Sequence, residues 1–354
     1  MSVKVMLVDD STIIRGLISR ALKEAGNIDI VATASNGLLA IQSAKAFQPE
    51  VIILDIEMPE MDGITALPKI LEVSPHSKVI MASTLTQTNA TISMKALELG
   101  AVDYLPKPSS TGDHSGLEAF YHDLRQKVSA LGLATKAQLR AQEPGVVKPA
   151  SSVIELDTRP MVGKFDAVAV ASSTGGPQAL QSLFGDLKGK LGHVPIFVTQ
   201  HMPPTFTTLL AENLTKQGGW NVAEGKDGEA VEPGRAYLAP GDYHMVVAKQ
   251  DNRVVLKINQ AAPENFCRPA ADPMLRSLSG IYKERLLVVV LTGMGQDGLL
   301  GAKEVVKNGG FVIAQDEDSC VVYGMPKAVV DGKLCKEVLP LQEIGAYLAK
   351  TVAP

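Results

Sequence analysis

The sequence predicts an α/β protein with two doubly wound parallel sheets joined by a tether. Short apolar runs alternate with stretches of helix length in both halves of the chain, which is the pattern of parallel strands connected by helices. The chain has 354 residues, 45% of them hydrophobic, which is enough for two cores. We divide it into a first domain at 1–126, a joining segment at 127–163 and a second domain at 164–354.

Composition argues against several functional classes. The formal net charge is −4 and basic residues do not cluster, so nucleic acid is not an expected partner. No apolar run approaches the roughly 20 residues that span a bilayer, and we expect a cytoplasmic monomer that does not insert into membranes. The cysteines lack metal-ligand spacing, which indicates reduced thiols. They are Cys267, Cys320 and Cys335.

The first domain carries five apolar runs that we interpret as strands. They are Val3–Val8, Ile30–Ala34, Val51–Leu54, Val79–Ala82 and Val102–Leu105. Stretches of helix length separate them, which predicts a parallel sheet covered by helices on both faces. In such a sheet, ligands bind at the carboxyl ends of the strands.

Acidic side chains follow two of these strands. Asp9 and Asp10 come directly after the first strand and Asp55 after the third. Carboxylates that converge repel each other unless a cation lies between them, and a set of oxygen ligands favours Mg²⁺. Ser83 ends the fourth strand and Lys107 follows the fifth. A hydroxyl and an ammonium group beside a metal-bound carboxylate can hold the oxygens of a transferred phosphoryl group.

The first domain resembles the receiver domains of response regulators, which have a flavodoxin-like (βα)5 fold. The resemblance is carried by Asp9, Asp10, the run 54–63 around Asp55, Ser83 with Thr84, and the run 104–108. It implies that Asp55 is phosphorylated, that Asp10, Asp55 and the backbone carbonyl of Glu57 hold Mg²⁺, and that Asp9 supports the metal site. The family's two switch positions and its phosphate-contacting lysine match Ser83, Tyr104 and Lys107.

An amphipathic helix closes the first domain, and its end lies in the joining segment. The pattern predicts an amphipathic helix over Leu117–Leu133. From Ala134 to Lys164, Pro, Gly and Ser recur, and this composition is typical of a flexible to semi-extended tether. A receiver tethered to a second globular unit indicates an output that phosphorylation regulates through contact between the two.

The second domain opens with the chemical feature around which we interpret the rest. The apolar strand Phe165–Ala171 leads into Ser172, Ser173 and a glycine turn, and Pro177 suits the first turn of a helix. Backbone N–H groups at such a corner can face a bound phosphate or an oxyanion that forms on a substrate. The turn alone does not distinguish a phosphate-binding site from an oxyanion site.

Two further strand ends favour an oxyanion site over a phosphate-binding site. The strand 194–201 ends at His201, and the strand beginning at Leu286 leads into a glycine-rich turn that contains Asp297. A serine, a histidine and an aspartate at the carboxyl ends of strands can form a hydrolytic triad. The histidine takes the serine proton, and the carboxylate fixes the histidine tautomer and stabilises the imidazolium.

Alternatives remain at this site. Ser172 competes with Ser173 as nucleophile, and the position of Ser173 relative to the Thr-Gly-Gly run at 174–176 favours Ser173. A dinucleotide site would need a G-x-G-x-x-G run and an acid after the second strand, and the sequence has neither there. A non-catalytic regulator whose serine turn only binds a partner or an anion also remains open.

The second domain resembles the protein-glutamate methylesterases of bacterial chemotaxis, the CheB family. The motifs lie at 172–177, 199–204, 239–244, 268–273, 291–298 and 314–326. The resemblance implies that Ser173 is the nucleophile, His201 the base and Asp297 its orienting acid, with the backbone N–H of Met294 as oxyanion donor. This chain has Ala-Ser before the nucleophile, where the family often has Gly-Ala.

The two resemblances together imply a phosphorylation-activated serine hydrolase. It would remove methyl esters from glutamates on the cytoplasmic helices of chemoreceptors, deamidate glutamines at the same site, and need no cofactor in the catalytic domain. A chemotaxis histidine kinase of the CheA type would be the phosphodonor, and the unphosphorylated receiver would restrain the catalytic domain. The same enzyme in a chemosensory pathway that controls surface behaviour, not swimming, is an alternative.

Overall fold

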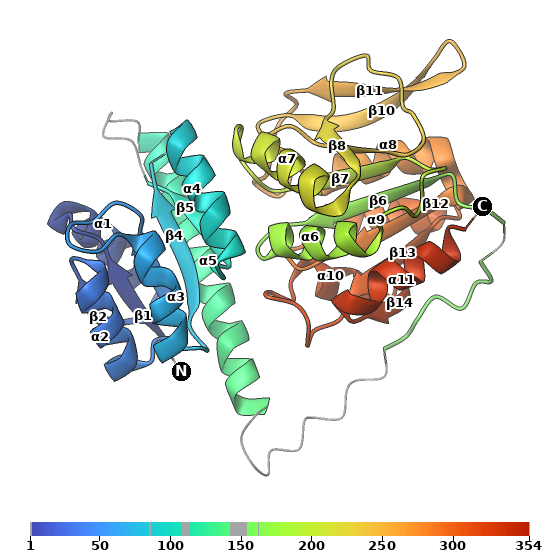
Figure 1. Ribbon diagram of the computed structural model, residues 1–354. Coiled ribbons are helices and arrows are strands. Elements are labelled where there is room, and N and C mark those ends of the chain that lie inside the picture. Colours follow the sequence, from blue (N-terminus) through green and yellow to red (C-terminus); the bar gives the residue numbers. More distant parts are fainter. Residues whose placement is uncertain (1, 85, 108–113, 142–153, 162, 354) are drawn as a thin grey trace. The chain divides into compact units, whose positions relative to one another are not determined.

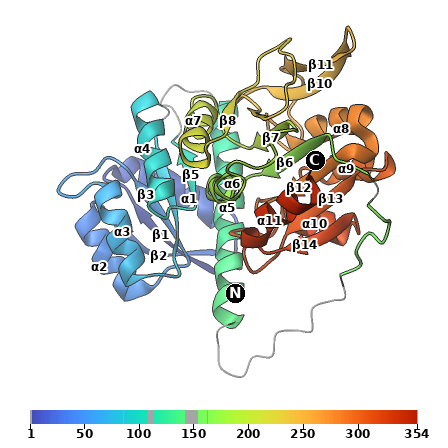
Figure 2. The ribbon, with the colours of Figure 1, turned by 45° about the vertical axis from the view of Figure 1, so that its right-hand side comes forward.

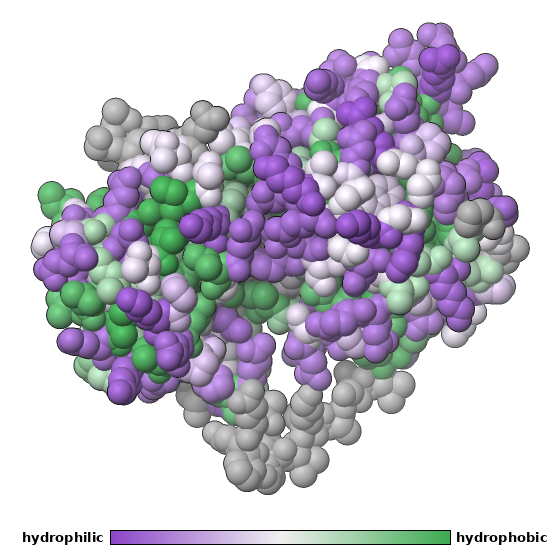
Figure 3. All heavy atoms as spheres, viewed as in Figure 1, coloured by the Kyte–Doolittle hydropathy of each residue, from purple (hydrophilic) through white to green (hydrophobic). Residues whose placement is uncertain are grey.

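The computed structural model describes residues 2–84, 86–107, 114–141, 154–161 and 163–353 (Figure 1). The chain divides into two compact units, 1–150 and 151–354. Each is an α/β unit with a parallel sheet, which confirms the predicted fold class. No helix among the described residues is long and apolar enough to cross a membrane. Figure 3 shows apolar side chains on the visible face of the first unit. Leu38, Leu39 and Phe47 are among the exposed large hydrophobic residues of this unit.

The first unit has the strand order β2-β1-β3-β4-β5, the order of flavodoxin-like sheets. Its strands are β1 (Val3–Val8), β2 (Ile28–Ala34), β3 (Val51–Asp55), β4 (Lys78–Ser83) and β5 (Asp103–Pro106). Its helices are α1 (Thr12–Lys23), α2 (Gly37–Phe47), α3 (Gly63–Val73), α4 (Gln87–Glu98) and α5 (His114–Ala141). Polar caps begin several helices: Asp62, for example, accepts a 2.7 Å hydrogen bond from the N–H of Thr65.

Helix α5 is longer than the sequence pattern predicts. The tether was expected from Ala134, but residues 134–141 continue the helix, so that expectation is wrong for these residues. The cause is packing: Leu131 and Thr135 are buried, and a Cβ added at Gly132 would lie 2.1 Å from Cγ1 of Val3. Residues 142–153 of the expected tether lie outside the described part of the chain.

The segment 154–161, which we also expected to belong to the tether, pairs with the second unit. The N–H of Asp157 donates to the carbonyl of Cys335 at 2.8 Å. Arg159 donates to the carbonyls of Val306 and Gly310 at 3.1 and 2.9 Å. These bonds hold the segment against the second unit.

The second unit has seven parallel strands in the order β14-β13-β12-β6-β7-β9-β8, and an antiparallel hairpin, β10-β11. The strands are β6 (Ala167–Ser172), β7 (Ile196–Gln200), β8 (Asn221–Glu224), β9 (Arg235–Leu238), β10 (His244–Gln250), β11 (Arg253–Asn259), β12 (Leu286–Val290), β13 (Phe311–Gln315) and β14 (Cys335–Leu339). The helices are α6 (Gly176–Asp186), α7 (Phe206–Gly218), α8 (Ala271–Tyr282), the short 3₁₀ helix η1 (Lys283–Arg285), α9 (Leu299–Lys307), α10 (Met325–Asp331) and α11 (Leu341–Thr351).

Helices cover both faces of this sheet. Helices α6, α7 and α11 lie on one face, and α8 and α9 lie on the other (Figure 2). The central strands β6 and β12 are therefore buried along their whole length, which explains their uninterrupted apolar sequences. Because β12, β6 and β7 are neighbours, the loops that follow them meet at one edge of the sheet.

Candidate active site and phosphorylation site

That edge brings the predicted triad residues together. Ser173 directly follows β6, His201 directly follows β7, and Asp297 lies in the loop between β12 and α9. The three loops come from adjacent parallel strands, so their side chains share one edge of the sheet. The structure thus brings a hydroxyl, an imidazole and a carboxylate to the same edge of the sheet.

Asp297 is the most firmly held of the three. Its Oδ2 lies 2.7 Å from Nε2 of His201 and accepts the N–H of Ala271 at 2.5 Å. Its Oδ1 accepts the N–H groups of Asp272 and Gly298 at 3.1 and 3.0 Å. Burial favours the neutral acid, but the hydrogen bond with His201 and those from the N-terminus of α8 outweigh it and lower the pKa of Asp297. The carboxylate therefore stays ionised beside the imidazole.

The electrostatic surroundings of His201 favour its protonated form. Burial disfavours the imidazolium, but electrostatic attraction to Cys267 and hydrogen bonds with Asp297 and Cys267 raise the pKa of His201 well above its usual value. Sequence reasoning missed Cys267, because its 66-residue separation from His201 gives no local signal. The structure brings it in on the loop between β11 and α8.

Ser173 is held by its backbone. Its N–H donates to the carbonyl of Thr292 at 3.0 Å, and its carbonyl accepts the N–H of Gly176 at 2.7 Å. Among the described residues, its hydroxyl forms no hydrogen bond with His201. Contacts between a nucleophile and its base are often long without substrate and tighten in the complex.

Ser172, the competing serine, has a different environment. Its residue is 0% exposed, and its hydroxyl donates a 2.7 Å hydrogen bond to Oε1 of Gln200. Nε2 of Gln200 in turn donates to the carbonyl of Ser173 at 2.9 Å. The buried hydroxyl of Ser172 is thus engaged in positioning Gln200, and this favours Ser173 as the nucleophile.

The peptide between Gly293 and Met294 lies against Ser173. A Cβ added at Gly293 would be 2.9 Å from Cβ of Ser173. The loop is fixed because the N–H of Gly293 donates to Val322 and its carbonyl accepts the N–H of Met325. Within the described part of the chain, the N–H of Met294 forms no hydrogen bond, so it is available to an oxyanion.

The predicted acidic cluster of the first unit also forms. Carboxylate oxygens of Asp9, Asp10 and Asp55 all lie within 4.8 Å of one another. Nζ of Lys107 lies 2.8 Å from Oδ2 of Asp9 and 2.6 Å from Oδ1 of Asp55. Burial raises the pKa of Asp55 to about 6, although Lys107 acts in the opposite direction. Three converging carboxylates, of which Asp9 and Asp55 are buried and Asp10 is exposed, offer the oxygen ligands that suit a hard divalent cation such as Mg²⁺.

The remaining predicted receiver positions lie around this cluster. The hydroxyl of Ser83 is 3.2 Å from that of Ser93 on α4. Tyr104 is buried in β5, and burial raises the pKa of its hydroxyl well above the usual value. Glu57 lies in the loop after β3, with its side chain exposed.

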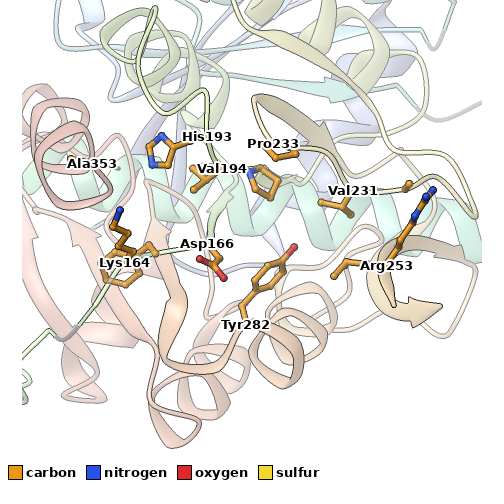
Figure 4. A pocket seen from close by; sticks show the side chains of 13 residues that line it. Lys164, Asp166, His193, Val194, Val231, Pro233, Arg253, Tyr282 and Ala353 are labelled. Carbon is orange, nitrogen blue, oxygen red and sulfur yellow. The ribbon is translucent and has the colours of Figure 1, made fainter. Parts of the chain in front are cut away.

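A cavity of about 560 Å³ lies at the opposite edge of the second sheet. Figure 4 shows its lining residues, which include Asp166 before β6, His193 before β7 and Pro233 before β9. These residues precede the strands, whereas the triad follows them. The predicted triad residues are therefore separate from this cavity. Gly295 and Gln296, which precede Asp297 in the same loop, are exposed to solvent.

Comparisons with known proteins cover both units. The family model of the CheB methylesterase matches residues 168–348, and that of the response regulator receiver domain matches residues 5–114. A "protein-glutamate methylesterase/protein-glutamine glutaminase 1" from Paramagnetospirillum magneticum is 47% identical over 99% of this chain and 97% of its own length. A protein of the same name, without the number, from Azospirillum brasilense is 50% identical over 98% of this chain and 92% of its own length. The crystal structure of the CheB methylesterase catalytic domain from Thermotoga maritima is 41% identical, with a TM-score of 0.51, over 53% of this chain and 99% of its own.

Proposed function

This chain belongs to the CheB methylesterase family, and we propose that Ser173, His201 and Asp297 are its catalytic triad. The chain is a protein-glutamate methylesterase and protein-glutamine glutaminase with a receiver domain, and it acts in the adaptation of chemotaxis receptors. The observation that carries the assignment of the triad is the 2.7 Å contact between His201 and a buried Asp297 at the strand end beside Ser173. The alternative of a non-catalytic regulator receives no support.

In the first half of the reaction, Ser173 forms an ester with the substrate. Its oxygen attacks the γ-carbonyl carbon of a glutamate methyl ester while His201 takes the hydroxyl proton. Asp297 stabilises the imidazolium that results. The tetrahedral intermediate collapses when His201 returns the proton to the methoxy oxygen, and methanol leaves. Glutamine would react in the same way with ammonia as the leaving group.

In the second half, His201 activates a water molecule that attacks the acyl-enzyme and releases glutamate and Ser173. Negative charge develops twice on the same carbonyl oxygen. The backbone N–H of Met294 is the donor that we assign to it, and a donor of this kind contributes about 10²–10³ in rate. The exposed position of this site suits a side chain presented by another protein, and the substrate that we expect is a cytoplasmic receptor helix.

Phosphorylation of Asp55 is the regulatory step. Asp9, Asp10, Asp55 and the carbonyl of Glu57 would hold Mg²⁺, which neutralises phosphoryl charge when it is bound. Lys107 would contact the phosphoryl oxygens in place of its present ion pair with Asp55. Ser83 and Tyr104, the matches to the family's switch positions, would transmit the change to the receiver surface.

Partners and location follow from this assignment. The phosphodonor would be a CheA-type histidine kinase and the substrate a chemoreceptor, so we place the chain in the cytoplasm, as a monomer. Unphosphorylated, the receiver (1–126) would restrain the catalytic domain (164–354) through the joining segment (127–163). Phosphorylation would release this restraint.

The direct test is methanol release from methylated receptor membranes, with and without acetyl phosphate. We expect release that acetyl phosphate and Mg²⁺ stimulate. Asp55→Asn should keep the unstimulated rate and lose the stimulation, because asparagine cannot accept the phosphoryl group. Stimulation that survives in Asp55→Asn would contradict the assignment of the phosphorylation site.

A further inference from the structure

A second buried carboxylate lies beside the triad, and the mechanism above does not use it. Asp272, the second residue of α8, is 0% exposed. Its Oδ1 accepts the N–H of Gly301 on α9 at 2.6 Å. Its own N–H donates to Oδ1 of Asp297 at 3.1 Å. Asp272 is therefore bonded both to the triad acid and to the helix that follows it.

The side-chain amide of Asn265 connects the two carboxylates. Its Nδ2 lies 3.1 Å from Oδ2 of Asp272 and 3.1 Å from Oδ1 of Asp297. An amide NH2 group has two hydrogens, so it can serve both acceptors at once. Oδ2 of Asp297 is left to face His201. Together with the N–H groups of Asp272 and Gly298, the bridge thus fixes which oxygen of the triad acid is presented to the imidazole.

The turn that carries Asn265 has an unfavourable backbone. The N–H of Cys267 donates to the carbonyl of Glu264 at 2.8 Å, which closes a four-residue turn. Its central residues, Asn265 and Phe266, have φ values of 51° and 62°. Asparagine adopts a positive φ readily, whereas an aromatic residue does so only with strain. Burial of Phe266 compensates for little of this strain, because the residue is 86% exposed. Strain of this kind persists where contacts hold the backbone, and here they include the two hydrogen bonds of Asn265 and the ion pair of Glu264 with Arg276.

Charges of both signs lie near Asp272 and shift its pKa in opposite directions. Burial and the neighbouring Asp297 raise the pKa of Asp272 to about 6. Arg276 attracts both carboxylates from the next turn of α8. The other titratable groups that face the pair are His201 and Cys267, and Glu264, which lies 2.5 Å from Arg276. At neutral pH the site therefore holds two carboxylates, of which Asp297 contacts the imidazole and Asp272 is bonded to Asp297.

We infer that Asp272 is a positioning residue of the esterase, which acts through Asn265 to orient Asp297 and whose charge stabilises the imidazolium form of His201. Imidazolium forms each time Ser173 loses its proton. A second negative charge nearby lowers the energy of that state. The inference rests on the triad proposed above, because Asp272 itself touches neither the substrate nor the reacting atoms.

The test compares the Asp272→Asn variant with the wild-type protein. Both are full-length chains, and both are activated by acetyl phosphate and Mg²⁺. The imidazole titration of His201 is followed by NMR, and methanol release from methylated receptor membranes is measured against pH. We expect the pKa of His201 to fall, because a negative charge is removed. The acid limb of kcat/KM should move to lower pH by the same amount, and kcat should fall by up to about 100-fold, the cost of a misplaced catalytic group.

Two further variants separate positioning from folding. Asn265→Gly removes the amide and suits a positive φ, so it should lower kcat. The loss of two hydrogen bonds to buried carboxylates should lower the thermal unfolding midpoint by only a few °C, and kcat is measured well below that midpoint. Ser279→Ala removes a buried hydroxyl from the same helix, further from the triad, and should leave the pKa of His201 unchanged.

The inference is overturned if folded Asp272→Asn has the wild-type pKa at His201, or if Asn265→Gly keeps the wild-type kcat. Failure of the proposed function has a different signature. In that case wild-type protein would release no methanol, while the NMR titration would still report on the charge coupling between Asp272 and His201.

Discussion

The hydroxyl of Ser172 donates a 2.7 Å hydrogen bond to Oε1 of Gln200, and this fixes the amide whose Nε2 holds the carbonyl of Ser173. An alanine at 172, which is frequent in the family, could not form the first of these bonds. In this chain the side chain of Ser172, the residue before the proposed nucleophile, therefore helps to hold the turn at Ser173. The two adjacent serines have separate consequences when they are replaced.

Ser173→Ala should abolish methanol release, because the side chain that would form the acyl-enzyme is removed. Ser172→Ala should retain most activity and lose about 1 kcal/mol of stability, the usual net contribution of one hydrogen bond. Methanol release from methylated receptor membranes and thermal unfolding measure the two effects. Near-normal turnover by Ser173→Ala together with an inactive, folded Ser172→Ala would reverse the assignment.

Gly176 leaves the space that Gln200 needs. A Cβ at position 176 would lie 1.9 Å from Oε1 of Gln200, so Gly176→Ala should displace the amide and with it the turn at Ser173. We expect a loss of about 1–3 kcal/mol in the free energy of unfolding and a lower kcat.

Gly185, in the same helix α6, provides the matched control. A Cβ there meets nothing within 4 Å, so Gly185→Ala should stabilise the domain by up to about 1 kcal/mol and leave kcat unchanged. Equal effects of the two alanines on kcat would show that Gln200 does not position the nucleophile.

The rate should depend on pH through His201, which must be neutral to act as a base. Because its pKa is raised, the acid limb of kcat/KM should lie above the ordinary histidine value of about 6.5. Asp297→Asn should move the limb to lower pH and reduce kcat by about 10⁴-fold, as loss of the orienting acid does in other triads. An acid limb unmoved in Asp297→Asn would contradict the pairing.

The free energy of unfolding should also depend on pH through His201 and Asp297. The raised pKa of His201 contributes stability below about pH 6.5, which is lost as the pH rises through the folded-state pKa. The lowered pKa of Asp297 contributes stability above about pH 4, which is lost as the pH falls through its folded-state value. The stability difference between wild type and Asp297→Asn should therefore be largest between about pH 4 and 6.5 in denaturant titrations.

Most of the fold could be predicted because it depends on local patterns. Apolar runs of strand length and the glycine turn after β6 are visible in a single sequence, and strand ends point to one edge once the sheet is parallel. This logic placed His201 and Asp297 together although 96 residues separate them. It requires no knowledge of individual contacts.

The support around the triad could not be predicted in this way. Asn265, Cys267 and Asp272 reach the site on a loop and a helix end, and only the packing of α8 on α9 determines where these arrive. The sequence signal was limited to the run 268–273, which indicated a motif but no role. Side chains that act through a tight turn leave no periodic pattern.

The end of α5 was missed for a related reason. Beyond Leu133 the sequence is polar enough to resemble a tether, yet Thr135 is buried within the first unit, as Val128 and Leu131 are earlier in the helix. Gly132 allows the close approach to β1, at Val3. The periodic pattern weakens there because a single narrow stripe of the helix is buried.

A fragment of residues 1–126 should therefore be less stable than one of residues 1–141. The shorter fragment loses Val128 and Leu131, each of which contributes about 1.5–3 kcal/mol when fully buried. It also loses Lys127, which donates to the carbonyl of Tyr104 at 2.8 Å and pairs with Asp103 at 3.3 Å. Thermal unfolding should give a clearly lower midpoint for 1–126 and closely similar midpoints for 1–141 and 1–150. Equal midpoints for all three would mean that the last turns of α5 add nothing to the receiver, and that a domain boundary at 126 suffices.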